Sequence, residues 1–493
     1  MSKKILSIPV ILGVAIEILQ FFTFAAAQEA RITVNLPENR RPVAEVRGRF
    51  PAAADSLAPG EIWFLDAIAG VEGLSRRRSQ VTVFGSGENI IAERQFVGVE
   101  RFSRADIGGY AYTVDLEPFG NTSAAHISWA DGSGGILMLD DLLPQSVGRN
   151  TLVTLTLPAG WKAFSAEASA SPGVYPVANA EKAVIYIGAG IRDRQIQAGG
   201  RTVNLNLSGE WLFTDNDAAE MTAAIFDAYS RQFGKLTDQP RHVFIGKFPG
   251  QSRFGAWEAE TRGRSVTILS ADMPFKAQSI QRLHEQLRHE IFHLWVPNGV
   301  NLSGNYDWFY EGFAQYAALK SGVASNQIRF DDMLTTLGQA YNIDQVQPDR
   351  RSLIEASALR FTGGNSMVYA KGMLVAFLSD IAIIKATNGK MSVESLLREI
   401  VAKHPLDAPR SDGNAAVLAV MRGRKELGPI IDRYITGSER LEWQTFLADA
   451  GIDAAGAAPL TKLAVKSDLN GRQKAILDKL GYNSWRKLSG NLK

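Results

Sequence analysis

The sequence predicts a multidomain chain in which an all-β, sandwich-like N-terminal domain is followed by an α+β domain that is mostly helical in its C-terminal half. Two observations support this plan. Short runs of β-branched and aromatic residues, separated by Gly, Pro, Asn and Asp, fill residues 31–211. After residue 212, apolar residues recur at helical spacing, and only two strand candidates interrupt them. With 493 residues, the chain is long enough for two or three domains.

The β-rich front half is expected to form one domain over residues 28–211. Its strand candidates are "RITVNL", "EIWFLDAIAG", "QVTVFG", "QFVGVERF", "YAYTVDL", "NTLVTLTLP", "KAVIYIG" and "RTVNLNL". All are short, and turn-forming residues separate them. Such spacing is typical of a β-sandwich or a related all-β unit.

The back half is expected to form a second domain over residues 212–452, followed by a helical tail over residues 453–493. In "TDNDAAEMTAAIFDAYSRQFG" the aspartates suit a helix N-terminus, and Gly234 suits its end. The strand candidates "RHVFIGKF" and "RSVTILS" precede a long helix that begins near Lys276 and that Pro297 ends. The tail holds one amphipathic candidate, "GRQKAILDKLGY".

Composition excludes several kinds of chemistry. The chain has no cysteine, so disulfides, thiolate metal ligands and a cysteine nucleophile are ruled out. Any metal site must therefore use histidine, carboxylate and water. The formal net charge is +2, so nothing predicts a broad basic surface for nucleic acid or an anionic membrane. The oligomeric state is not indicated.

The N-terminus resembles a secretory signal peptide over residues 1–27. Two lysines precede an apolar run from Ile5 to Ile16, and Ala25 and Ala27 form an A-x-A pattern. The carboxylate of Glu17 argues against a permanent membrane anchor. We therefore expect export, to the periplasm or beyond the cell, with cleavage near Ala27. No later stretch is expected to be apolar enough to span a bilayer.

A pair of histidines carries the strongest functional signal. In "LRHEIFHLW", His289 and His293 are four residues apart on a predicted helix, so their side chains share one face. Two imidazoles on one face suit zinc, and Glu290 is placed to reach a water rather than the metal. H-E-x-x-H is the pattern of metallopeptidases in which this glutamate is the general base. A chance pattern of surface residues is the alternative.

Two histidines do not complete a zinc site, and Glu311 is the expected third ligand. It lies in "DWFYEGFAQYAAL", near the start of a second predicted helix. The intervening segment contains Pro297, Gly299 and Gly304, which suit a turn that returns the second helix against the first. A carboxylate joining two histidines is the arrangement of thermolysin-type sites, which bind one zinc ion and keep a position for water. A purely structural zinc is the alternative, but it would leave Glu290 unexplained.

These residues resemble the motifs of the gluzincin zinc metallopeptidases. "HEIFHLW" followed by "WFYEGFAQY" is similar to the zinc motifs of the glycyl aminopeptidase family and of its relative, the aminopeptidase N family. "GAWEA" resembles their G-x-x-E substrate motif, "YAKG" their Y-x-K-G segment, and "IIDRYITGSERLEWQTFLADAGI" the helical segment that closes the glycyl aminopeptidase catalytic domain. The resemblance covers residues 212–452, where it implies a thermolysin-like catalytic domain.

The resemblance also implies a role for each matched residue. Tyr369 would donate a hydrogen bond to the oxyanion that forms from the scissile carbonyl. Glu258 would bind the free amino group of a peptide substrate, and Gly255, Ala256 and Trp257 would lie beside it in the substrate site. The implied protein is an exported, zinc-dependent aminopeptidase that acts on peptides or proteins.

Other residues depart from the family pattern or have no assigned role. Gln315 stands four residues after the third ligand, where several gluzincins have an aspartate that orients the first histidine. A glutamine carbonyl could still accept that imidazole N–H. Glu260 is a rival to Glu258 as the amine anchor. His284 is expected to be solvated, and His126 has no partner pattern.

Three other functions stay open from the sequence. Without an amine anchor, the same site could be that of an endopeptidase that binds peptide along the "GAWEAETRGR" strand. A zinc hydrolase acting on a non-peptide substrate is a second alternative. The third is an exported binding protein whose peptidase domain is silent.

Overall fold

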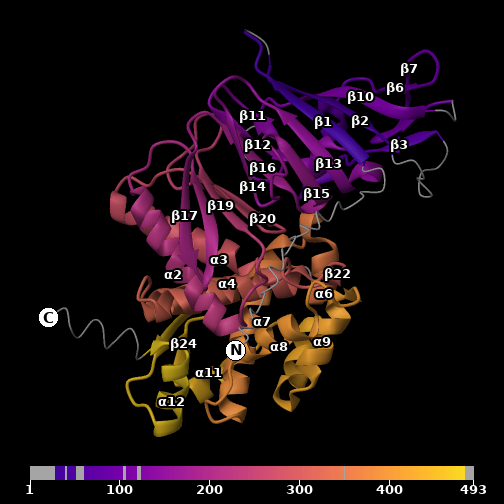
Figure 1. Cartoon of the computed structure of the whole chain (residues 1–493). Helices are drawn as coiled ribbons and strands as arrows, with labels where there is room; N and C mark the ends of the chain where they lie inside the picture. Colours follow the sequence, from indigo (N-terminus) through magenta and orange to yellow (C-terminus); the bar gives the residue numbers. More distant parts are fainter. Residues whose placement is uncertain are drawn as a thin grey trace, which may run out of the picture.

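The computed structural model describes residues 28–38, 41–50, 60–103, 107–118, 124–348 and 350–482, and the predicted signal segment lies outside them. Figure 1 shows a β-rich N-terminal part, then a second sheet, then helices that continue toward the C-terminal end. The multidomain plan predicted from the sequence, β-rich first and mostly helical later, is confirmed.

Two sheets pack face to face in the N-terminal part. The larger has the strand order β15 (Val174–Asn179), β13 (Arg149–Thr156), β1 (Gln28–Asn35), β2 (Val43–Arg49), β10 (Ile107–Asp115), β6 (Thr82–Gly85), β7 (Ile90–Ile91). The smaller has the order β11 (Trp129–Ala130), β12 (Gly134–Met138), β16 (Val184–Gly188), β14 (Lys162–Ser165). Every second side chain of β2 is buried, as in a strand with one face on a core. Val46 and Tyr112 of the larger sheet share that core with Ile185 and Ile187 of the smaller.

Shorter elements complete this part of the chain. They are β3 (Glu61–Trp63), β4 (Ala67–Ile68), β5 (Val71–Glu72), β8 (Glu93–Phe96), β9 (Val99–Arg101) and the one-turn helix α1 (Leu139–Leu142). The β4–β5 hairpin reaches the back half of the molecule, because a Cβ added at its Gly70 would lie 3.1 Å from the ring of Phe361. The front domain therefore touches the back half near the site described below.

A separate sheet of five strands begins the back half of the molecule. Its order is β17 (Arg192–Ala198), β18 (Arg201–Leu207), β19 (Arg241–Gly246), β21 (Ser265–Ser270), β20 (Trp257–Arg262). Strands β18, β19 and β21 run parallel, and β20 pairs antiparallel with β21 at the edge. The predicted boundary at residue 212 is therefore too late, since β17 and β18 pair with the back-half sheet. The composition of a strand does not show which sheet it joins.

Helices cover this sheet and form the rest of the back half (Figure 1). They are α2 (Asp215–Phe233), α3 (Lys276–Phe292), α4 (Asp307–Ala324), α5 (Phe330–Val346), α6 (Leu353–Ala358), α7 (Asn365–Ala386), α8 (Val393–Lys403), α9 (Gly413–Arg422), α10 (Gly428–Ile430), α11 (Gln444–Ala450) and α12 (Gly471–Lys479). Two short pairs, β22 (Leu302–Ser303) with β23 (Ser411–Asp412) and β24 (Ile452–Ala455) with β25 (Lys462–Val465), lie among them. The predicted tail helix is α12, but the β24–β25 hairpin that precedes it was not predicted.

Two glycines let α4 and α7 approach each other at backbone distance. A Cβ added at Gly312 would lie 2.4 Å from the carbonyl carbon of Gly372, and one added at Gly372 would lie 2.6 Å from the carbonyl oxygen of Trp308. Such separations are far below van der Waals contact, so no larger residue fits either position without moving a helix. The close packing brings Glu311 of α4 near Tyr369 of α7.

Helix α7 corrects one sequence expectation. Among the residues that the structure describes, it is the one helix long and apolar enough to cross a membrane by length and composition. However, 94% of its apolar window is buried inside the protein. A helix that is apolar on all sides suits a position surrounded by other helices, and α4, α5 and α6 all pack against α7.

Candidate metal centre and active site

The C-terminal end of helix α3 presents the two histidines of the H-E-x-x-H motif to one point: His289 lies in its last turn, and His293 is the C-cap residue that follows Phe292. His289 and His293 are buried, and their Nε2 atoms are 3.1 Å apart. His293 Nδ1 is 3.1 Å from the backbone carbonyl oxygen of Val296. Since a carbonyl can only accept, Nδ1 carries the proton and the Nε2 lone pair is left for a cation.

Glu311, on α4, completes a set of three converging ligand atoms. Its Oε2 is 3.3 Å from His289 Nε2 and 3.5 Å from His293 Nε2. A tetrahedral zinc ion with bonds of about 2.0–2.1 Å separates its ligand atoms by about 3.3–3.4 Å. Among the described residues, this buried oxygen has no hydrogen-bond donor. The donor set and its spacing therefore fit one zinc ion, as the sequence predicts.

The electrostatics of the three residues favour a positive charge at this point. Burial alone would raise the pKa of Glu311, but the two imidazoles and Arg360 hold it well below its usual value. Burial likewise would lower the pKa of His293, but the Glu311 carboxylate raises it to about 9. In the absence of a metal, the site therefore holds a proton, and a metal ion would have to displace it.

Glu290 lies beside the candidate metal site, and a hydrogen bond from β20 holds its carboxylate. Its Oε1 is 4.0 Å from His289 Nε2, and its Oε2 accepts a hydrogen bond from Thr261 Oγ1 at 2.8 Å. Thr261 belongs to the edge strand β20. Burial raises the pKa of Glu290, while the charges of His289 and His293 lower it. This position suits a carboxylate that takes a proton from a water at the metal.

Tyr369 reaches the same site from α7. Its ring lies over the imidazole of His289, with 6.4 Å between ring centroids. Its hydroxyl oxygen accepts a hydrogen bond from Arg360 Nη2 at 2.8 Å. Burial, and then the charge of Glu311, raise the pKa of Tyr369 well above its usual value, so the phenol keeps its proton. It can therefore act as a hydrogen-bond donor.

A cavity of about 780 Å³ lies over these residues and has walls from both halves of the molecule. The lining includes His289, Glu290, Glu311 and Tyr369 from the helices and residues 259–262 of β20. Residues 68 and 69 of the β4–β5 hairpin, together with His126, contribute the front-domain wall. β20 is the last strand of its sheet, so its outer side has no strand partner among the described residues, and there the carbonyl oxygen of Thr261 accepts a hydrogen bond from Asn298 Nδ2 at 2.9 Å. An extended peptide could pair with the rest of this edge.

The predicted substrate-binding residues of "GAWEA" are not part of this cavity. Gly255, Ala256, Trp257 and Glu258 are absent from its lining. The Glu258 carboxylate instead accepts a hydrogen bond from the backbone N–H of Ala125 at 3.3 Å. Ala256 packs against the core between the smaller front sheet and β19. The first part of β20 thus contacts the front domain, and the cavity opens further along the strand.

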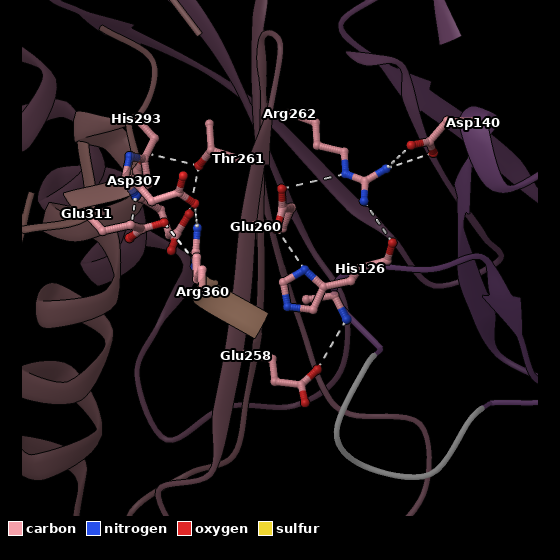
Figure 2. A network of polar contacts seen from close by, with 12 residues as sticks. His126, Asp140, Glu258, Glu260, Thr261, Arg262, His293, Asp307, Glu311 and Arg360 are labelled. Carbon is pink, nitrogen blue, oxygen red and sulfur yellow. Dashed lines mark hydrogen bonds and ion pairs between the residues drawn. The ribbon is translucent and has the colours of Figure 1, made fainter. Parts of the chain in front are cut away.

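Glu260, the rival residue, does line the cavity. Its Oε2 lies 2.7 Å from Nδ1 of His126, a front-domain histidine with no signal in the sequence (Figure 2). Arg262 fixes this histidine: its Nη2 donates to the carbonyl oxygen of His126 at 2.9 Å, and its Nη1 donates to both carboxylate oxygens of Asp140 at 2.7 and 2.8 Å. Burial would lower the pKa of His126, but Glu260 raises it.

Two further sequence expectations need correction. Gln315 does not orient His289, because Nδ1 of that imidazole has no hydrogen-bond partner among the residues described. His284 is not solvated: it is only 4% exposed, and Arg288 contacts its ring nitrogen. A helical rotation angle places His284 away from His289, but it does not show what packs over that face.

The fold is that of the M1 zinc metallopeptidases, as comparison with solved structures shows. The chain superposes on an aminopeptidase N family protein from Idiomarina loihiensis with a TM-score of 0.73 at 15% identity, covering 87% of this chain and 79% of that one. An M1 zinc metallopeptidase from Deinococcus radiodurans gives a TM-score of 0.54 at 16% identity, covering 84% and 94%. A variant of the latter was solved with bound Tyr-Ser-Ala substrate. Comparison with protein-family models and with curated proteins gave no match.

Proposed function

We propose that this chain is an exported, zinc-dependent peptidase of the gluzincin type that removes residues from the N-terminus of peptides. The observation that supports it most is the convergence of His289 Nε2, His293 Nε2 and Glu311 Oε2 at separations of 3.1–3.5 Å, in a cavity that the edge strand β20 also lines. The shared fold with M1 zinc metallopeptidases agrees with this proposal. Export rests on the N-terminal sequence pattern alone.

Zinc held by His289, His293 and Glu311 would supply a more acidic water and polarise the scissile carbonyl. Glu290 accepts the proton of the attacking water and later gives a proton to the leaving amine. The Tyr369 hydroxyl donates a hydrogen bond to the carbonyl oxygen as negative charge develops on it. Both groups lie in the cavity beside the ligands.

A peptide substrate is held by two features of β20. Its backbone pairs with the free edge of the strand, which brings one peptide bond to the metal ligands. The Glu260 carboxylate, rather than that of Glu258, binds the α-ammonium group, because Glu260 lines the cavity and Glu258 does not. An amine anchor beside the metal limits cleavage to the first residue.

The first test is hydrolysis of amino-acid anilides and short peptides by the purified zinc protein, with and without a chelator. Activity that chelation abolishes and zinc restores is expected. Activity that is indifferent to chelation, or that survives unchanged in Glu290→Gln, would reject this mechanism.

A matched pair of variants tests the amine anchor. Glu260→Gln is expected to lower kcat/KM for peptides with a free N-terminus by roughly 10- to 100-fold, the value of a hydrogen bond to a charged group. Glu258→Gln, two residues away on the same strand, is expected to change it by less than about 3-fold. If Glu258→Gln lowers kcat/KM more than Glu260→Gln does, then Glu258 rather than Glu260 binds the ammonium group.

An endopeptidase is the second candidate, and one observation favours it. Glu260 already has His126 at 2.7 Å and Arg262 Nε at 3.7 Å, so part of its charge is neutralised before any substrate binds. Mass spectrometry of a digested peptide pool separates the two functions. Loss of single N-terminal residues supports the aminopeptidase, and internal cuts support the endopeptidase.

A further inference from the structure

Arg360 is a partly buried cation at the proposed active site, and the proposed mechanism assigns it no role. It begins the short 3₁₀ helix Arg360–Thr362 between α6 and α7, and its side chain is 16% exposed. It lines the cavity with the ligands. Burying a guanidinium is costly unless partners compensate for lost water, so its contacts define what it does.

The two terminal nitrogens of Arg360 meet four acceptors on α4 and α7. Nη2 is 2.9 Å from Glu311 Oε1 and donates to the Tyr369 hydroxyl oxygen at 2.8 Å. Nη1 donates to Asp307 Oδ1 at 2.9 Å and to the Tyr310 hydroxyl oxygen at 3.5 Å. Two NH₂ groups carry four N–H bonds, so one planar fork serves the whole set. Figure 2 shows Arg360 between Asp307 and Glu311.

The first consequence concerns how Glu311 faces the metal site. Arg360 binds Oε1, while Oε2 points toward the two imidazole Nε2 atoms. A carboxylate with both oxygens free can bind a metal through one or both of them. With Oε1 bound to the guanidinium, Glu311 would offer a metal ion a single oxygen and leave room for a water at it.

The second consequence concerns the direction of the Tyr369 proton. The phenol oxygen accepts from Arg360, so its own O–H must point elsewhere, and the Glu311 carboxylate is within hydrogen-bonding reach of it when no substrate is bound. The packing of Gly312 against Gly372 sets how close α4 and α7 are, but it does not set the rotation of a side chain at the end of each helix. The guanidinium supplies that restraint by binding both side chains at once.

We propose that Arg360 is a positioning residue that holds Glu311 to one-oxygen ligation and aims the Tyr369 hydroxyl at the reacting carbonyl. The part that concerns Tyr369 rests on the proposed peptidase function. The part that concerns Glu311 depends only on a metal ion being bound. The two parts of the proposal are therefore tested by separate measurements.

The first measurement is the visible spectrum of the cobalt(II)-substituted protein, which needs no substrate. Four-coordinate cobalt(II) absorbs much more strongly than five- or six-coordinate cobalt(II), so the band reports ligand number. Arg360→Met is expected to weaken the band, because Oε1 of Glu311 becomes free to bind. Arg422→Met, which removes an exposed arginine paired with Asp432, is the matched control and should keep the parent spectrum. An unchanged spectrum in Arg360→Met overturns the ligation role.

The second measurement is a double-mutant cycle on peptide hydrolysis. Arg360→Met and Tyr369→Phe are each expected to lower kcat by roughly 100-fold, the scale seen on losing one oxyanion donor, with a smaller change in KM. If Arg360 acts through Tyr369, the double variant should be no slower than the slower single variant by more than about 3-fold. If the two losses in kcat multiply in the double variant, Arg360 and Tyr369 act independently, and the proposal that Arg360 orients Tyr369 is overturned.

Two more variants separate charge from geometry. Arg360→Lys keeps the positive charge but loses the planar fork, so both effects are expected to persist. Full recovery by lysine would contradict a positioning role. If Arg360→Met does not fold, Asp307→Asn weakens the same fork without touching Glu311 or Tyr369, and it should shift both readouts in the same direction. A parent protein that cleaves no peptide but whose cobalt band responds to Arg360 would refute the proposed function while leaving the ligation role supported.

Discussion

Replacing Gly312 by alanine tests how the two halves of the site are brought together. The added Cβ would lie 2.4 Å from the carbonyl carbon of Gly372, about 1 Å inside ordinary contact, and the neighbouring atoms are backbone that cannot rotate away. Alanine gains about 1 kcal/mol of helix propensity over glycine. Overpacking a core costs about 1–3 kcal/mol or more, and here α4 must move away from α7 as a unit. The overpacking cost less the propensity gain gives a net loss of up to about 2 kcal/mol, and more if the cost exceeds that range.

Urea unfolding followed by tryptophan fluorescence gives the stability, and competition with a chromophoric chelator gives the zinc affinity. Moving α4 shifts Glu311 relative to the histidines of α3, so Gly312→Ala should also bind zinc more weakly. Gly471→Ala is the matched control, because a Cβ at that helical position meets nothing within 4 Å. It should unfold at the parent concentration of urea or slightly above it. A Gly312→Ala protein with parent stability and parent zinc affinity would refute the packing argument.

Three shorter predictions follow from the site. Glu290→Gln should lower kcat by about 10²- to 10⁴-fold at unchanged zinc content, and equal activity in this variant would contradict the general-base role. Although burial lowers it, Glu311 raises the pKa of His293 to about 9, so zinc binding at neutral pH should release a proton and weaken as the pH falls. Calorimetry in two buffers of different ionisation enthalpy measures this release, and identical heats would exclude it. Arg262→Ala leaves Asp140 buried without its partner, which should cost about 3–5 kcal/mol in urea unfolding; an unchanged midpoint would contradict this.

The convergence of the three candidate zinc ligands could be predicted because their geometry is encoded locally. His289 and His293 share a helix face by their spacing alone, and the structure brings their Nε2 atoms to 3.1 Å. Glu311 follows after a turn-rich segment, so the return of the second helix is also a short-range feature. The resemblance added Tyr369, and the Gly372 that follows it in "YAKG" has a packing reason that only the structure shows.

Arg360 and His126 could not be predicted, because nothing local marks them. Arg360 meets its acceptors from a short connecting turn, and His126 comes from a different domain. The partners of both residues are set by tertiary folding. The same limit explains β17 and β18, whose residues predict strands correctly but do not reveal that they pair with β19.

The choice between Glu258 and Glu260 shows what a strand motif cannot distinguish, namely which of two neighbouring carboxylates lines the cavity. The two residues are two apart on β20, so the alternation of a strand puts both on one face, and both do contact the front domain, at Ala125 and His126. Both residues are glutamates, and the two-residue period of a strand puts both on the same face. Neither feature therefore shows which carboxylate lines the cavity. The two glutamates are distinguished by the point at which α3 crosses β20, where Thr261 contacts Glu290. That crossing places the cavity beside Glu260, so the motif identified a strand that lines the cavity, and helix packing decides which of its two carboxylates faces that cavity.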